Sequence, residues 1–227
     1  MGAIVKQVPP LKAGDVLTRD EFLRLWDAHP EIKKAELIGG IVYMPSPVGF
    51  DHGDYDNRNA TWLGTYAAFT PGTRASSNAT ALMGEDAPQP DEHLRLLAEA
   101  GGRTGVVDKL LTGPPELASE IVHTSAAYDL HQKRDLYEAS GVFEYVAILL
   151  HEQEIRWHLL QDGKYQLLEP SPGGVWKSVT FPGLWLHGPA MLAEDMAKVL
   201  ATLRRGLRSA EHAKFVEQLR KKMKRSK

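Results

Sequence analysis

The chain has 227 residues, 43% of them hydrophobic and 25% charged, with a formal net charge of −2 and no cysteine. This composition predicts a globular protein with one main domain. It excludes disulfides, thiolate metal sites, cysteine nucleophiles and attachment to nucleic acid by bulk charge alone. The sequence shows no signal-peptide pattern and no apolar run of about 18 residues, so we expect a cytoplasmic protein without a membrane segment.

The first elements expected along the chain are a short helix, a strand pair and a longer helix. TRDEFLRLWDAH begins with Thr18 and has Glu21 three residues later, which is the capping-box pattern of a helix start. AELIGGIVYM predicts two strand segments joined by a tight turn at two glycines, with Glu36 at its beginning. Aromatic and apolar residues between 52 and 69 have the spacing of a second helix.

The middle of the chain predicts strands followed by a third helix. RASSNATALM and PQPDEHLRLL are typical of strands, and the second of them begins at Asp91. Residues 98–115 are expected to form a loop long enough to bring this strand back antiparallel to ELASEIV. A helix is expected from Ser125, a plausible N-cap, to Gly141, whose position suits a helix end.

The last third predicts strands and then helices. VFEYVAILL and EIRWHLL are typical of strands, QDG predicts a hairpin into KYQLLE, and a short segment GVWKSVTFPGLWL follows. Helical patterns continue from Pro189 to the end. The final helix, from Ser209, has an apolar side that we expect to pack on the domain or on a partner subunit, with RKKMKRSK as a solvated basic tip. The order of elements favours a mixed sheet with helices packed on it.

Two charged residues fall where apolar ones are expected. Alternation in ELASEIV places Glu120 on a face with small apolar residues, and helical spacing places Lys133 on the inward stripe with Tyr137. An unpaired carboxylate there would cost several kcal/mol. A buried ion pair is one explanation, and a core role is the ordinary one for Tyr137. The other explanation is a functional site, because Asp91 could lie beside Glu120 if their strands are antiparallel neighbours.

Asp91, Glu120 and Lys133 are together the residue types needed for metal-dependent phosphodiester hydrolysis. Two carboxylates on neighbouring strands suit Mg²⁺, which prefers oxygen ligands and keeps several waters. Such an ion lowers the pKa of a bound water, and a lysine can orient or deprotonate that water or stabilise charge on the phosphate.

Several spaced motifs carry a family resemblance. PQPD, PPELASEIV and SAAYDLHQKRDLYEASGVFEYV occur in this order, with AELIGGIVYMPSP and HG before them and FPGLWL and RSAEHAKFVEQL after them. They resemble the Uma-type restriction endonucleases, within the PD-(D/E)XK nuclease superfamily, over nearly the whole chain. The resemblance implies an α/β, restriction-endonuclease-like fold: a mixed central β-sheet flanked by helices, with a C-terminal helical extension. We expect a nuclease domain in residues 1–190 and a helical arm with a basic end in residues 191–227.

The resemblance also assigns residues. It implies that Asp91 and Glu120 bind Mg²⁺, for which Mn²⁺ could substitute, together with the backbone carbonyl of Ile121. The usual superfamily lysine two residues after the glutamate is absent, because Val122 stands there. In this family the lysine comes from the following helix, which here means Lys133.

Three further residues complete the candidate site. Glu36 resembles an acidic residue that many such nucleases carry on an early element, and it would be a further ligand or hold a water. His52 matches a family histidine and is a candidate substrate contact. His93 is another candidate because it lies beside Asp91, although charged residues interrupt that strand and indicate an exposed edge or a groove lining.

These expectations define one main hypothesis and two alternatives. The main one is a Mg²⁺-dependent endonuclease that hydrolyses DNA and works as a homodimer or higher homo-oligomer, because a duplex has two strands to cut. The first alternative is a catalytically inactive DNA-binding or interaction module on the nuclease scaffold. The second is a metal-dependent hydrolase of another phosphate ester. The sequence does not distinguish DNA from RNA.

Overall fold

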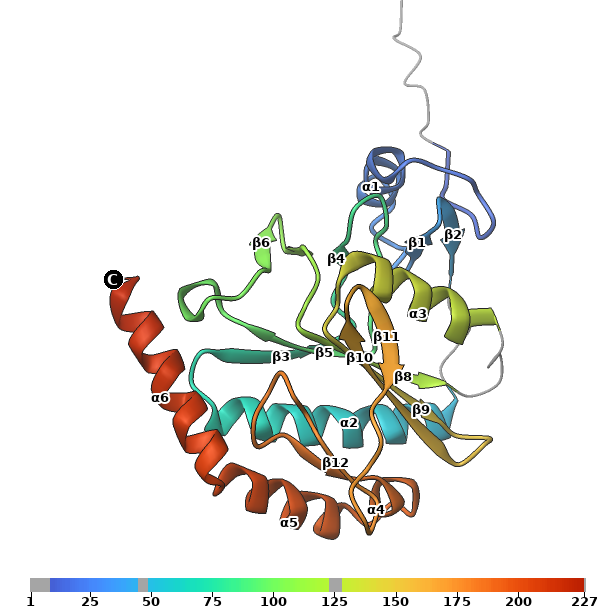
Figure 1. Cartoon of the computed structure of the whole chain (residues 1–227). Helices are drawn as coiled ribbons and strands as arrows, with labels where there is room; N and C mark the ends of the chain where they lie inside the picture. The colour runs from blue at the N-terminus through green and yellow to red at the C-terminus, as the bar shows by residue number, and fades with distance from the viewer. Residues whose placement is uncertain (1–8, 45–48, 123–127, 227) are drawn as a thin grey trace, which may run out of the picture.

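A six-stranded mixed sheet forms the centre of the molecule in the computed structural model, which describes residues 9–44, 49–122 and 128–226 (Figure 1). Its strand order is β11-β10-β9-β8-β5-β3, with β8 and β9 parallel and all other neighbours antiparallel. The bounds are β3 (Thr73–Ser77), β5 (Glu92–Leu96), β8 (Leu117–Val122), β9 (Glu144–Leu149), β10 (Glu154–Gln161) and β11 (Lys164–Leu167). The expected mixed sheet flanked by helices is confirmed.

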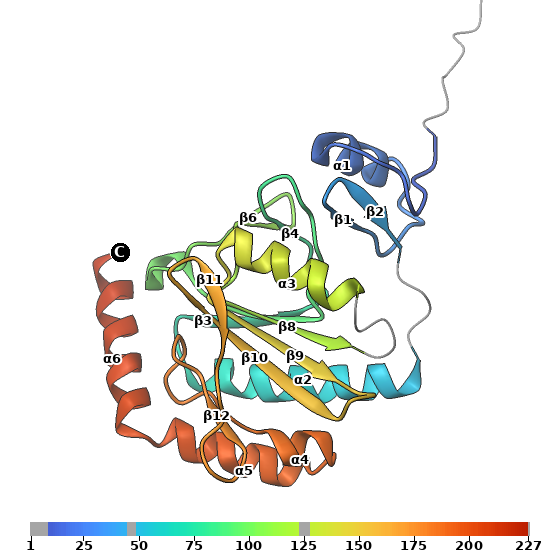
Figure 2. The same ribbon diagram turned by 45° about the vertical axis from the view of Figure 1, so that its right-hand side comes forward.

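Helices cover the two faces of this sheet. The long helix α2 (Phe50–Phe69) crosses one face and α3 (Tyr128–Ser140) lies over the other, as both views show (Figures 1 and 2). The C-terminal helices α4 (Gly188–Leu192), α5 (Met196–Leu207) and α6 (Ala210–Arg225) follow on the α2 side. The expected N-cap at Ser125 lies outside the described residues, whereas the helix ends as expected before Gly141, which has a φ of 79°.

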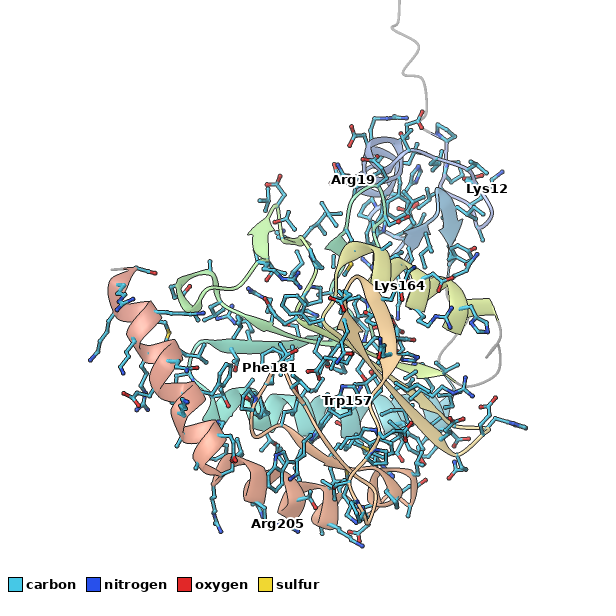
Figure 3. All side chains as sticks on the ribbon, in the orientation of Figure 1. Lys12, Arg19, Trp157, Lys164, Phe181 and Arg205 are labelled. Atoms are coloured by element: carbon cyan, nitrogen blue, oxygen red, sulfur yellow. The ribbon has the colours of Figure 1, made fainter. Side chains whose placement is uncertain are left out.

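The apolar residues of β8 divide between two hydrophobic clusters. Leu117 and Ile121 face the α2 side, and Ala118 and Val122 face the α3 side, as strand alternation predicts. Trp157 and Phe181 belong to the α2-side cluster and are labelled in Figure 3. The same cluster includes residues of α5, so this helix packs into the core below the sheet.

The N-terminal part adds a helix and a hairpin. Thr18 and Glu21 form the expected capping box of α1 (Arg19–Asp27). Strands β1 (Glu36–Ile38) and β2 (Ile41–Tyr43) pair antiparallel around Gly39 and Gly40, whose positive φ values explain why glycine occupies this turn. Strand β1, which begins at Glu36, contacts α3.

The segment expected to be a loop, residues 98–115, contains regular structure. It holds the 3₁₀ helix η1 (Ala98–Ala100) and a hairpin of β6 (Gly105–Val107) and β7 (Leu110–Thr112), which β4 (Ala81–Leu82) extends into a three-stranded sheet. Asp108 and Lys109 occupy the hairpin turn with positive φ values, and neither residue is a glycine. The expected single strand before β5 is also divided, because the chain turns at Asn78 with a φ of 50°.

Strand β5 is not an exposed edge, so the first of the two expectations for this strand was wrong. It lies between β3 and β8, and its charged residues Glu92, His93 and Arg95 are all buried. The polar interruption of its sequence therefore reflects a buried polar row, not a solvent-facing edge.

The C-terminal elements close the molecule. β12 (Val175–Lys177) and β13 (Trp185–His187) pair antiparallel before the last helices. Helix α6 packs on the domain, as one of the two expected arrangements predicts: Leu219 is buried and α6 contacts η1. Within the described residues, no helix is both long enough and apolar enough to cross a membrane.

Candidate active site

The antiparallel register of β5 and β8 brings two carboxylates together. Glu92 lies opposite Ser119, and His93 lies opposite Ala118. Continued by one residue, this register sets Asp91 opposite Glu120, and side chains of directly opposite residues share one face of a sheet. The Oδ2 atom of Asp91 accepts a hydrogen bond from the backbone N–H of Ile121 at 2.9 Å, which ties the end of one strand to the other.

Pro90 explains why the backbone carbonyl of Ile121 has no ladder partner on the β5 side within the described residues. In the same register Pro90 lies opposite Ile121, and proline has no N–H to donate to a ladder. The N–H of Ile121 points toward Asp91, and in a strand the carbonyl of the same residue points to the same side. The next carbonyl, that of Val122, points the other way and accepts from Leu150 at 3.0 Å. Within the described residues, the Ile121 carbonyl therefore has no ladder partner on the β5 side.

Lys133 joins this group from α3. Its Nζ lies 3.0 Å from Oε2 of Glu120 and 3.2 Å from Oε1 of Glu36. The other oxygen of Glu120 accepts a hydrogen bond from the Tyr137 hydroxyl at 2.6 Å. Lys133 and Tyr137 are one turn apart on α3, so a single helix face holds both oxygens of the carboxylate.

Glu36 reaches the group from the N-terminal hairpin. Its Oε1 also accepts a hydrogen bond from the backbone N–H of Gln89 at 2.6 Å, two residues before Asp91. This contact holds the segment that precedes β5 against β1. Glu36 is therefore a shared partner of the strand entrance and of Lys133, although it comes from an element far away in the sequence.

Two basic side chains stand at the outer side of Asp91. The Nε2 atom of His52, on the first turn of α2, lies 3.6 Å from Oδ2 of Asp91, and Nζ of Lys34 lies 3.8 Å from Oδ1. Lys34 also donates to the side chain of Asn78 at 2.6 Å. The side chains of His52 and Lys34 are more exposed than that of Asp91, so they mark the solvent side of the group.

Comparison with known proteins identifies the family. A family model described as "Putative restriction endonuclease" matches residues 19–190. The chain belongs to the Uma2 family. This match spans every residue of the group described above, from Lys34 to Tyr137.

A solved structure supports the same fold for this Uma2 protein. The crystal structure of a "putative nuclease belonging to DUF820" from Anabaena variabilis matches with a TM-score of 0.57 and 17% identity, covering 82% of this chain and 99% of that one. At this identity the likeness establishes the fold. No curated protein matches the chain.

The electrostatics of the Uma2 site are dominated by buried negative charge. Burial raises the pKa of Glu120 to about 8; Lys133 opposes this, while Asp91 and Glu36 add to it. Burial alone would lower the pKa of Lys133, but Glu120 and Glu36 outweigh it and hold that pKa well above its usual value. One lysine thus faces three carboxylates, and the group favours an additional cation.

Asp91 differs from Glu120 in its protonation. Burial alone would raise the pKa of Asp91, but hydrogen bonds from His52 and Ile121 and the charge of Lys133 together lower it. Asp91 is therefore the carboxylate that stays ionised most readily. An ionised carboxylate beside a free backbone carbonyl is a natural anchor for a hard cation.

His93, the other candidate substrate contact, is buried. The residue has 1% relative exposure, and neither ring nitrogen has a hydrogen-bond partner among the described residues. Burial lowers the pKa of His93 to about 4. His93 shares the sheet face of Asp91, which is also buried, and its contact with substrate stays a prediction.

Some members of the group were not recognised from sequence. Tyr137 was assigned to the core, and it is fully buried, yet its hydroxyl also holds Glu120. Lys34 was not singled out, because nothing in its local pattern predicts that it reaches Asp91 across the fold. The signal for Tyr137 was present: it lies four residues after Lys133, on the same helix stripe.

Proposed function

We propose that this Uma2 protein is a metal-dependent endonuclease that hydrolyses phosphodiester bonds of DNA. The observation that carries the proposal is the meeting of Asp91, Glu120 and Lys133 at the end of two paired strands. Family membership supports nuclease chemistry. A homodimer or higher homo-oligomer in the cytoplasm, with two such sites facing a duplex, completes the proposal.

The residues fit Mg²⁺, with Mn²⁺ as a substitute. Asp91, Glu120 and the carbonyl of Ile121 would hold the ion, and Glu36 would hold it or a water. Among the described residues, no three acidic or histidine side chains are grouped as a finished metal cage. Such a cage is not required, because Mg²⁺ typically takes one or two carboxylates and keeps several waters. When bound, the ion would activate a water and offset charge on the phosphate.

The protein's own residues define the remaining roles. Lys133, beside Glu120, would orient or deprotonate the attacking water or stabilise charge on a phosphate oxygen. Tyr137 fixes the orientation of Glu120 through its 2.6 Å hydrogen bond. His52, at the solvent side of Asp91, would contact a substrate as it enters.

The test is cleavage of supercoiled plasmid DNA with Mg²⁺ or Mn²⁺. Asp91→Asn and Lys133→Met should each lower the nicking rate by at least about a hundredfold, since each removes charge that the transition state needs. Lys198→Met changes an exposed lysine on α5 and should leave the rate unchanged. Equal nicking by wild type, Asp91→Asn and Lys133→Met would show that the activity comes from a contaminant and would reject the proposal.

One feature favours the alternative of a catalytically inactive DNA-binding module. Lys133 is already engaged by Glu36 and Glu120, as in a purely structural ion pair. In that case wild-type protein would bind DNA equally in Mg²⁺ and EDTA and would not nick it. Glu120→Gln would then leave DNA affinity unchanged or increase it. A gain in thermal stability with Mg²⁺ that Asp91→Asn abolishes would instead support the metal site independently of activity.

A further inference from the structure

A row of polar side chains leads away from the candidate active site along β5. Side chains alternate between faces along a strand, so Asp91, His93 and Arg95 point to the same face of the sheet. In the pairing of β3 with β5, Arg74 lies opposite Arg95 and Ser76 lies opposite His93. β3 is the edge strand, so this row reaches the margin of the sheet (Figure 1).

The two arginines form an unusual pair. Like charges directly opposite each other in a sheet are destabilising, and Arg95 is buried at 6% exposure. Among the residues that the structure describes, the Nε of Arg95 has no hydrogen-bond partner, and its Nη1 reaches only the Thr104 hydroxyl, at a long 3.4 Å. Arg74 is exposed, and no hydrogen bond or ion pair within the described part of the chain engages its side chain.

Nearby carboxylates do not neutralise this pair directly. Glu116 is close enough to act on Arg95 through space, but its oxygens accept from the backbone N–H groups of Leu96 and Arg103. Burial and the charge of Arg74 together lower the pKa of Arg95, although Glu116 and Glu99 offset part of this. A buried guanidinium that is underpaired and faces a second guanidinium requires an anion for full compensation.

We propose that Arg74 and Arg95 form a phosphate-binding site that holds the DNA backbone at a distance from the cleaved bond. This inference rests on the proposed nuclease function. Arg95 follows Asp91 by four positions, which corresponds to roughly 13 Å along an extended strand. A DNA strand carries one phosphate per nucleotide, so the contact would fall on a backbone phosphate a few nucleotides from the scissile one.

The test measures binding without cleavage. A fluorescein-labelled DNA duplex is titrated in EDTA at several salt concentrations, and the dissociation constant is followed by fluorescence anisotropy. Arg74→Ser should weaken binding roughly tenfold and reduce the slope of log affinity against log salt by about one. Arg204→Ser removes an exposed arginine from α5 and is the matched control, with no change expected in either quantity.

Arg95→Met is a second variant that tests the buried member of the pair. Because it can also perturb folding, its circular dichroism and melting temperature are measured alongside binding. The proposal is overturned if Arg74→Ser matches wild type in affinity and salt slope, or if wild type does not bind DNA. A wild type that binds through Arg74 but never cleaves would reject the nuclease proposal and keep the phosphate site. Cleavage that Arg74→Ser leaves unchanged would reject the phosphate site and keep the nuclease proposal.

Discussion

At the scale of single residues, Glu144 shows how a buried carboxylate can serve structure alone. It lies at the start of β9 with no exposed surface, and its Oε2 accepts a hydrogen bond from the Trp157 indole at 2.8 Å. Its Oε1 accepts from the Ser178 hydroxyl and from the backbone N–H groups of Val179 and Thr180. One side chain thus fixes the segment after β12 against the central sheet, with every donor satisfied.

Glu144→Ala should be among the most destabilising changes in the molecule. It leaves several buried donors without an acceptor, and we expect a loss of at least about 3 kcal/mol in the free energy of unfolding. The measurement is urea denaturation at pH 7. Glu154→Ala removes a half-exposed carboxylate that pairs with Arg156, and this control should change stability by no more than about 0.5 kcal/mol. Similar losses in the two variants would contradict the role assigned to Glu144.

Some of the buried charged residues could be predicted from the sequence, and others could not. Strand and helix periodicity were sufficient to place Glu120 and Lys133 inward, and the structure joins them at 3.0 Å. The same reasoning could not find Lys34 or the anchoring role of Glu144. Their partners lie far away in the sequence, and only the assembled register brings them into contact.

At the scale of elements, two glycines on helices predict opposite responses to alanine. Gly206 of α5 is buried where the helix meets the segment before β13, and a Cβ there would come within 2.2 Å of the Gly183 carbonyl oxygen. At Gly64 of α2, no described residue beyond the adjoining turns of the same helix comes within 4 Å of the corresponding position. Helix propensity favours alanine at both sites, so the difference between them isolates the packing of α5.

Gly206→Ala should lower the free energy of unfolding by about 1–3 kcal/mol, because the close helix contact must open. Gly64→Ala should instead raise it by about 0.5–1 kcal/mol, because it restricts the unfolded chain without a clash. Thermal unfolding of the two variants beside wild type gives the comparison. A stabilised Gly206→Ala protein would show that α5 is not closely seated on the molecule.

The elements that could be predicted from the sequence are those that local signals define. The capping box, the paired glycines of β1 and β2, and the Asp162–Gly163 turn are local signals, and each was found where the sequence indicated. The β6–β7 hairpin was missed because its turn residues, Asp108 and Lys109, adopt positive φ without glycine. The interior position of β5 was missed because buried charges imitate the pattern of an edge.

At the scale of the whole molecule, buried ionisable groups oppose one another as pH changes. Burial raises the pKa of Glu144 above its usual value. Its contribution to stability is therefore present at low pH and is lost as pH rises through that raised pKa. Burial lowers the pKa of His158 and of His212, which reverses the sign. Below about pH 6.5 these two histidines bind protons more readily in the unfolded chain than in the folded protein, so stability is lost as pH falls.

His158→Phe should reveal one of these opposing contributions. His158 stacks on Tyr145 with ring centroids 5.6 Å apart, and its Nδ1 has no hydrogen-bond partner, so phenylalanine can keep the stacking and remove the titration. The difference in unfolding free energy between variant and wild type is measured by urea denaturation from pH 8 to pH 5. The value at pH 8 reports packing together with the loss of the hydrogen bond to the Tyr145 backbone. Below about 6.5 the variant should gain on wild type by up to about 1.4 kcal/mol per pH unit, the most that one proton can contribute. A difference that stays constant over this range would mean that His158 is protonated as easily in the folded protein as in the unfolded chain.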